Sequence, residues 1–340
     1  MRFWQTLLLN QRGMLIVRHE VEAAFKAAIA DRLGFAPRAL VADGRIHRFG
    51  EKRTDSSGWY VLHEGDYPAG AFGSWRGSVS EKWSYGTGLV KLSPDERQAL
   101  LKEQAERRRQ EEERLLSLAI RAQKVAHELL QAASFEGVDD HPYAVRKQVL
   151  LPAVKVIEGA VLEGILAKYK MRALIDSTQS VLLVPMFSLQ QGKGQLRSVQ
   201  LIDHNGLKRF LQGTQKKGCF FAFGGKLSGA IEVDLCEGVA TAASVFAERG
   251  KLTVSAFDCG NLLPVAQALV QSYPYLSITL IADNDRKTQG NPGVTAAKAV
   301  RSALPFNVSI FIPAFPANAP IELSDFNDLM CLQAVQGSTQ

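Results

Sequence analysis

Hydrophobic and polar positions alternate with two different periods between residues 230 and 313. Short apolar runs predict strands, and apolar positions three or four residues apart predict helices. The pattern predicts strands over 230–236, 252–257, 277–282 and 307–313, and helices over 239–249, 262–272 and 294–303. Gly250 is expected to end the first helix. Strands that alternate with helices in this way favour a mostly parallel α/β sheet.

Acidic residues follow two of these strands. Glu237 comes after the first strand, and Asp283 and Asp285 come after the third. Because ligands of open parallel sheets bind beyond the carboxyl ends of the strands, the three side chains are candidates for one site. The Asp-x-Asp turn suits Mg²⁺, which takes few protein oxygens, and Glu237 is a candidate general acid or base. Taken singly, a solvated loop and a simple turn explain these motifs better, but their place at one sheet edge favours a functional site.

Four motifs occur in order in and after this region. They are Cys236-Glu-Gly-Val-Ala-Thr-Ala242, Ala256-Phe-Asp-Cys-Gly-Asn-Leu262, Ala282-Asp-Asn-Asp285 with Asn291-Pro-Gly293, and Ser324-Asp-Phe-Asn-Asp-Leu329. Together they resemble the primases of conjugative plasmids and satellite phages, and the Glu237 and Asp283-Asn-Asp285 motifs resemble the TOPRIM domain.

The resemblance implies a TOPRIM fold, Rossmann-like with a mostly parallel sheet, as a catalytic domain over residues 229–340. It also implies that Mg²⁺ or Mn²⁺ is held by Asp283 and Asp285 with help from Asp325 and Asp328. Glu237 would assist proton movement or complete the metal site. Val239 departs from these primases, which usually have an aromatic residue there.

The preceding residues, 134–228, are predicted to form a basic α+β subdomain that binds nucleic acid. Residues 191–228 carry one acid, Asp203, and these basic residues: Lys193, Arg197, Lys208, Arg209, Lys216, Lys217 and Lys226. Such a one-sided surplus is typical of a phosphate-binding surface. A basic subdomain before TOPRIM also resembles replicative primases, in which it forms the nucleic-acid groove. A charged face kept only for solubility is the alternative.

Residues 1–90 are predicted to form a small accessory domain rich in aromatic residues and short strands. Aromatic and basic residues interleave there, and the cluster around Trp75 and Arg76 resembles the N-terminal region of the same primases. Stacking faces beside cations suit single-stranded nucleic acid, whereas the simpler alternative is that the aromatic residues fill a β core. Residues 91–133 are predicted to be a charged helical connector.

Composition agrees with a soluble cytoplasmic protein that has an anionic partner. The 340 residues carry a net charge of +6 and are 46% hydrophobic, which is enough for more than one core. The four cysteines are scattered with no Cys-x-x-Cys pair, so neither a structural zinc site nor a disulfide framework is expected. No apolar stretch approaches the ~18 residues that span a bilayer, and no secretory signal is expected.

The resulting hypothesis is a DNA primase that makes short RNA primers on single-stranded DNA from ribonucleoside triphosphates. A replicative helicase would have to be another chain because no P-loop occurs here. Two alternatives remain open: a TOPRIM nuclease that uses the same acids to cleave DNA, and a non-catalytic single-stranded DNA-binding replication protein.

Overall fold

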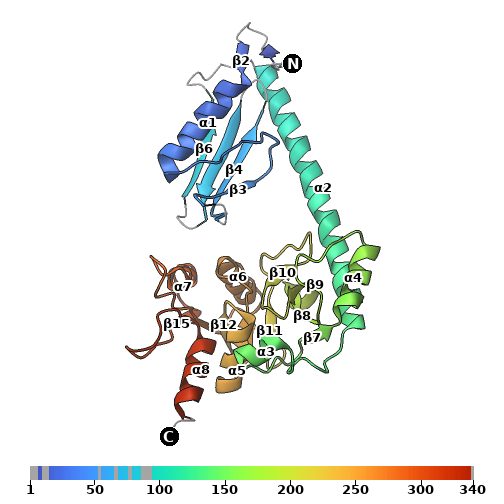
Figure 1. Cartoon of the computed structure of the whole chain (residues 1–340), viewed down its shortest axis with the longest axis vertical. Helices are drawn as coiled ribbons and strands as arrows, with labels where there is room; N and C mark the ends of the chain where they lie inside the picture. Colours follow the sequence, from blue (N-terminus) through green and yellow to red (C-terminus); the bar gives the residue numbers. More distant parts are fainter. Residues whose placement is uncertain are drawn as a thin grey trace. The chain divides into compact units, whose positions relative to one another are not determined.

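A computed structural model describes residues 7–9, 15–52, 55–64, 68–75, 79–85 and 94–337. Contacts divide the chain into two units, residues 1–101 and 102–340 (Figure 1). It is a mixed α/β protein with several separate sheets. None of its described helices has the length and apolar composition needed to cross a membrane.

The first unit is built on a four-stranded antiparallel sheet covered by one helix. Its elements are β1 (Leu7–Leu9), β2 (Leu15–Val17), α1 (Arg18–Leu33), β3 (His47–Phe49), β4 (Gly58–His63), β5 (Ala69–Ser74) and β6 (Val79–Ser84). Strands β3 to β6 pair in chain order, while β1 pairs only with β2. Phe25 of α1 is fully buried and makes ring contacts with Tyr60, Phe72 and Trp83 at centroid distances of 6.1, 5.8 and 4.8 Å. These three aromatic side chains therefore belong to the core, as expected from the alternative that aromatic residues here fill a β core.

The long helix α2 (Pro94–Ala132) confirms the predicted helical segment and buries its C-terminal part in the second unit. It is followed by α3 (Pro142–Lys147), β7 (Lys155–Ile157), α4 (Gly159–Lys168), β8 (Val181–Gln190), β9 (Lys193–Ile202) and β10 (Lys208–Phe210). The strands form an antiparallel sheet in the order β10-β9-β8-β7. Both faces of β8 are covered: Leu183 packs in the core with α2 and α4, and Leu182 packs in another core with α5.

The second sheet of this unit confirms the predicted alternation. Its elements are β11 (Phe221–Phe223), β12 (Glu232–Cys236), α5 (Val239–Arg249), β13 (Thr253–Ser255), a 3₁₀ turn (Cys259–Asn261), α6 (Leu262–Ser272), β14 (Ser277–Ile281), α7 (Pro292–Ala303), β15 (Val308–Phe311) and α8 (Phe326–Gly337). The order is β11-β13-β12-β14-β15, and β12 to β15 are parallel. The edge strand β11 is antiparallel.

Helices cover both faces of this five-stranded sheet. Val265 of α6 and Val300 of α7 join Leu235 in one core, and Ala243 of α5 and Phe326 of α8 join the other. The core that contains Ala243 and Phe326 also contains side chains of β8. The four-stranded and five-stranded sheets of this unit therefore share it. The proposed boundary between residues 134–228 and 229–340 stays a prediction.

Candidate active site

Three neighbouring parallel strands are each followed within three residues by an acidic residue, at the same edge of the sheet. Glu237 follows β12 directly, Asp283 follows β14, and Asp258 follows β13 on the other side of β12. Asp258 was not among the predicted site residues, although its place after a predicted strand was the available signal. Because parallel strands have their carboxyl ends at one edge, these acids gather there.

The turn that carries Asp283 and Asp285 is fixed by asparagine side chains. Asn284 donates from Nδ2 to the carbonyl of Pro313 at 3.0 Å, and its Oδ1 accepts Asn291 Nδ2 at 2.9 Å. The Asn291 Oδ1 accepts the backbone N–H of Asp285 at 2.9 Å. The side chain of Asn284 therefore holds the Asp-Asn-Asp turn through hydrogen bonds to Pro313 and Asn291.

Helix α7 begins against this turn. The backbone N–H of Gly293, in its first turn, donates to Asp285 Oδ2 at 2.9 Å. A Cβ at residue 293 would lie 2.3 Å from the Asp283 carbonyl oxygen, so only glycine permits this approach. The Asn-Pro-Gly motif thus fixes the position of both aspartates.

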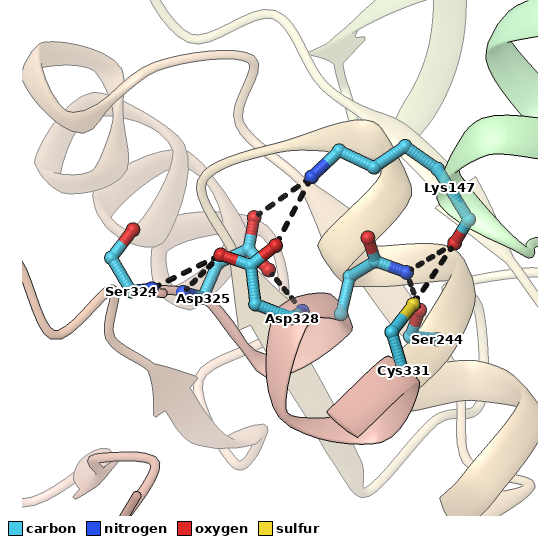
Figure 2. Close-up of polar contacts among 7 residues, drawn as sticks. Lys147, Ser244, Ser324, Asp325, Asp328 and Cys331 are labelled. Carbon is cyan, nitrogen blue, oxygen red and sulfur yellow. Dashed lines mark hydrogen bonds and ion pairs between the residues drawn. The ribbon is translucent and has the colours of Figure 1, made fainter. Parts of the chain in front are cut away.

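Asp325 and Asp328 lie at the start of α8 and bind each other's backbone (Figure 2). Asp325 Oδ1 accepts the N–H of Asp328 at 2.7 Å, and Asp328 Oδ2 accepts the N–H of Ser324 at 3.0 Å. Lys147 of α3 places its Nζ 3.3 Å from Asp328 Oδ1 and 3.8 Å from Asp325 Oδ2. Burial acts to lower the pKa of Lys147, but the two carboxylates outweigh it and raise the pKa.

The same end of α3 is fastened to α8 by uncharged groups. The Lys147 carbonyl accepts Asn327 Nδ2 at 2.7 Å, and Asn327 Nδ2 also donates to Ser244 Oγ at 3.0 Å. Cys331 Sγ lies 3.6 Å from the same carbonyl (Figure 2). Lys147 was not among the predicted site residues, because nothing in the chain order shows that α3 meets α8.

Most of the predicted basic residues fall into two groups. Lys208 and Arg209 are exposed on β10. Burial raises the pKa of Glu237, and the charge of Lys208 opposes this rise, so Lys208 lies close enough to act on the acids. Lys216 forms an ion pair with Asp258. The structure therefore brings Lys208 and Lys216 to the acidic edge, with Arg209 next to Lys208 on the strand.

Arg197 and Lys217 instead line a pocket of about 240 Å³ between α2 and the end of the β8–β9 hairpin. Arg197 donates to Ser188 Oγ at 2.7 Å on its wall. Lys193 is exposed at the start of β9. In the first unit Trp75 is 58% exposed, while Arg76 lies outside the described residues.

Two of the acids have strongly raised pKa values. Burial, followed by the charges of Glu237 and Asp325, raises the pKa of Asp283 to about 8. Burial, followed by Asp258 and Asp285, raises the pKa of Glu237 to about 7. The Asp283 Oδ1 atom is buried and has no hydrogen-bond partner among the residues that the structure describes. A buried carboxylate oxygen among other carboxylates costs free energy unless a proton or a cation accompanies it.

Comparison with known proteins finds similarity to DNA primases, the same class of enzyme that the sequence motifs resemble. A protein described as DNA primase TraC from Escherichia coli is 33% identical over 300 residues, which cover 82% of this chain. A second Escherichia coli DNA primase TraC is 29% identical over 299 residues, or 85% of the chain. The chain is a relative of these DNA primases. The resemblance to primases inferred from the sequence is thereby confirmed.

The chain spans only about a quarter and a fifth of the length of these two primases, 25% and 19%. No family model matches the chain. A solved structure of the DnaG catalytic core matches this chain with a TM-score of 0.40 and 12% sequence identity. The match covers 66% of this chain and 78% of the DnaG chain.

The acids at the sheet edge fit a divalent cation. Among the described residues, no three His, Cys, Asp or Glu side chains form a ready-made group for one ion. Mg²⁺, however, is commonly held by one or two carboxylates and completes its shell with water and phosphate oxygens. The Asp283 oxygen that lacks a partner among the described residues is compatible with such a partly open site.

Proposed function

We propose that residues 229–340 form the TOPRIM catalytic domain of a DNA primase, which makes short RNA primers on single-stranded DNA by metal-dependent nucleotidyl transfer. One structural observation supports this most: the buried oxygen of Asp283, which has no partner among the described residues, lies at the sheet edge where Glu237 directly follows a parallel strand. Sequence identity with DNA primases supports the reaction class.

A bound Mg²⁺ or Mn²⁺ would orient the incoming triphosphate and offset the charge that develops as a 3′-hydroxyl attacks it. Asp283 and Asp285 are the proposed ligands, and the Gly293 N–H fixes the orientation of Asp285. Asp325 and Asp328 would join them only by giving up Lys147, which they hold in this structure. With a pKa of about 7, Glu237 can accept or release a proton near neutral pH.

Lys208 and Arg209 are proposed to hold the template or the nucleotide phosphates beside the acids. Both are exposed on β10, and the charge of Lys208 acts on the Glu237 carboxyl group. Arg209 is the next residue and points to the other face of the strand. Lys216 is a weaker candidate for this role because Asp258 already neutralises it. Phosphate contacts of this kind position a strand without reading its sequence.

The proposal is tested by incubating the chain with single-stranded DNA, labelled ribonucleoside triphosphates and Mg²⁺ or Mn²⁺. Short labelled oligoribonucleotides that depend on template are the expected product. Shortened template without such products would identify a nuclease instead. A mobility shift with neither product would identify a non-catalytic binding protein.

A further inference from the structure

Only one face of the sheet in the first unit is covered by a described helix. Helix α1 packs on the face that carries Tyr60, Leu62 and Phe72 (Figure 1). Gly70 lies on this face too, because a Cβ there would lie 2.9 Å from the Phe25 ring. Side chains alternate between the faces of a strand, so the residues between these positions point to the opposite side.

Strand pairing sets out what that opposite side presents. Arg48 pairs with Trp59, Trp59 with Gly73, and Gly73 with Ser80, which forms one row across all four strands. In the next row Val61 pairs with Ala71, and Ala71 with Lys82.

This opposite side is the helix-free face of the sheet. It has no carboxylate among its positions on strands β3 to β6. Those positions are Arg48, Trp59, Val61, His63, Ala69, Ala71, Gly73, Ser80, Lys82 and Ser84. Glu81 lies on the other face, where it forms an ion pair with Arg32 of α1. The charge that the strands place on the helix-free face is therefore positive.

Two tryptophans lie at one end of this face. A Cβ on Gly73 would lie 2.9 Å from the Trp59 ring, so the indole lies over a residue that has no side chain. The Trp75 ring is 5.8 Å from the Trp59 ring, at an interplanar angle of 38°. The Arg48 guanidinium lies 5.8 Å from the centre of the Trp75 ring. Trp75 is 58% exposed, which sets it apart from the aromatic side chains of the core.

We propose that this helix-free face binds single-stranded nucleic acid, with bases stacked on Trp75 and Trp59 and phosphates contacted by Arg48 and Lys82. An aromatic platform next to cations, on a face without strand carboxylates, matches flexible bases joined by phosphates. The proposal shares its ligand with the proposed function but needs none of the catalytic acids. It therefore holds or fails independently of primer synthesis.

The test measures the affinity of the full chain for fluorescent oligonucleotides at several salt concentrations, in EDTA and without nucleotides. Trp75→Leu should weaken binding between about fivefold and a hundredfold, because one stacked base is lost. Its salt dependence should stay unchanged, because no charge is removed. Arg48→Gln with Lys82→Gln should instead flatten the log-log salt slope by about 1.4, or roughly 0.7 for each phosphate contact.

Matched controls separate this face from general surface effects. Tyr275→Leu removes an aromatic side chain that is 95% exposed in the other unit. Arg38→Gln removes a charge on the α1 side of the first unit, where Lys26 of α1 donates to the Arg38 carbonyl. Both controls should bind like the unaltered chain.

Oligo(dT) and oligo(rU) form the two arms of the experiment. If the variants lose affinity for both oligonucleotides, the face binds single-stranded DNA and RNA alike. If they lose affinity for only one, the face binds that type of nucleic acid. Wild-type affinity and slope in the Trp75 and Arg48/Lys82 variants would overturn the proposal, as would equal losses in the controls.

Discussion

Asparagine at position 283 should make the metal-free protein more stable while removing its proposed activity. The pKa of Asp283 is raised from 3.8 to about 8, chiefly by burial. Between these two values the folded chain holds a proton that the unfolded chain has released. The free energy of unfolding therefore falls as the pH rises through this window, and the loss is complete above about pH 8. A neutral amide of similar size does not titrate and escapes this loss.

The size of the effect follows from the difference of about four pH units between the two pKa values. At about 1.4 kcal/mol per unit this gives about 6 kcal/mol as an upper bound, since side chains relax and water enters the site. For Asp283→Asn we expect a gain of about 1–3 kcal/mol near pH 9 and almost none near pH 4.

Urea unfolding followed by circular dichroism, in EDTA at several pH values, measures this gain. Glu322→Gln is the control, because the pKa of this surface carboxyl group is lowered by a backbone hydrogen bond and by Lys287. Its removal should not stabilise the protein at high pH. Mg²⁺ should also stabilise the unaltered chain more than Asp283→Asn near pH 9. Equal stability of Asp283→Asn and the unaltered chain at pH 9 would refute the reasoning.

Three further predictions concern residues around the same sheet edge. Glu237→Gln should lower primer synthesis strongly, because the amide keeps the size but cannot accept a proton; unchanged turnover in a steady-state assay would make Glu237 structural. Lys208→Ala with Arg209→Ala should weaken single-strand binding and flatten its log-log salt slope by about 1.4, which a titration over several salt concentrations measures; a wild-type slope would show that neither contacts phosphate. Gly293→Ala should destabilise the chain by more than about 1 kcal/mol in thermal unfolding, because its Cβ meets the Asp283 carbonyl. Gly164→Ala in α4, with open space around its Cβ, should instead stabilise the chain by up to about 1 kcal/mol. Similar effects of the two changes would contradict the close approach of α7.

Much of the second unit could be predicted from the sequence because its signals are local. Helix α5 begins and ends at the predicted residues, since Gly250 adopts the left-handed conformation that ends it. The place of Glu237 and Asp283 at one edge follows from parallel strand order alone. Asp258 was within reach of the same reasoning, because it too follows a predicted strand.

Other features depend on contacts between distant segments, which periodicity does not reveal. The antiparallel edge strand β11 pairs with β13, about thirty residues further along the chain. Lys147 meets Asp328 only because α3 packs against the start of α8. In the first unit, the sequence around Trp59 and Trp83 does not show which face of the sheet each side chain occupies. The strand register places Trp59 on the helix-free face and Trp83 against Phe25.

The most direct test of the central claim is primer synthesis by Asp283→Ala and Asp285→Ala, measured with labelled ribonucleotides on a single-stranded template. If these carboxylates hold the metal, both variants should lose template-dependent products while circular dichroism and metal-free strand binding stay near those of the unaltered chain. Near-normal primer synthesis by either variant would contradict the assignment of the active site to this edge of the sheet.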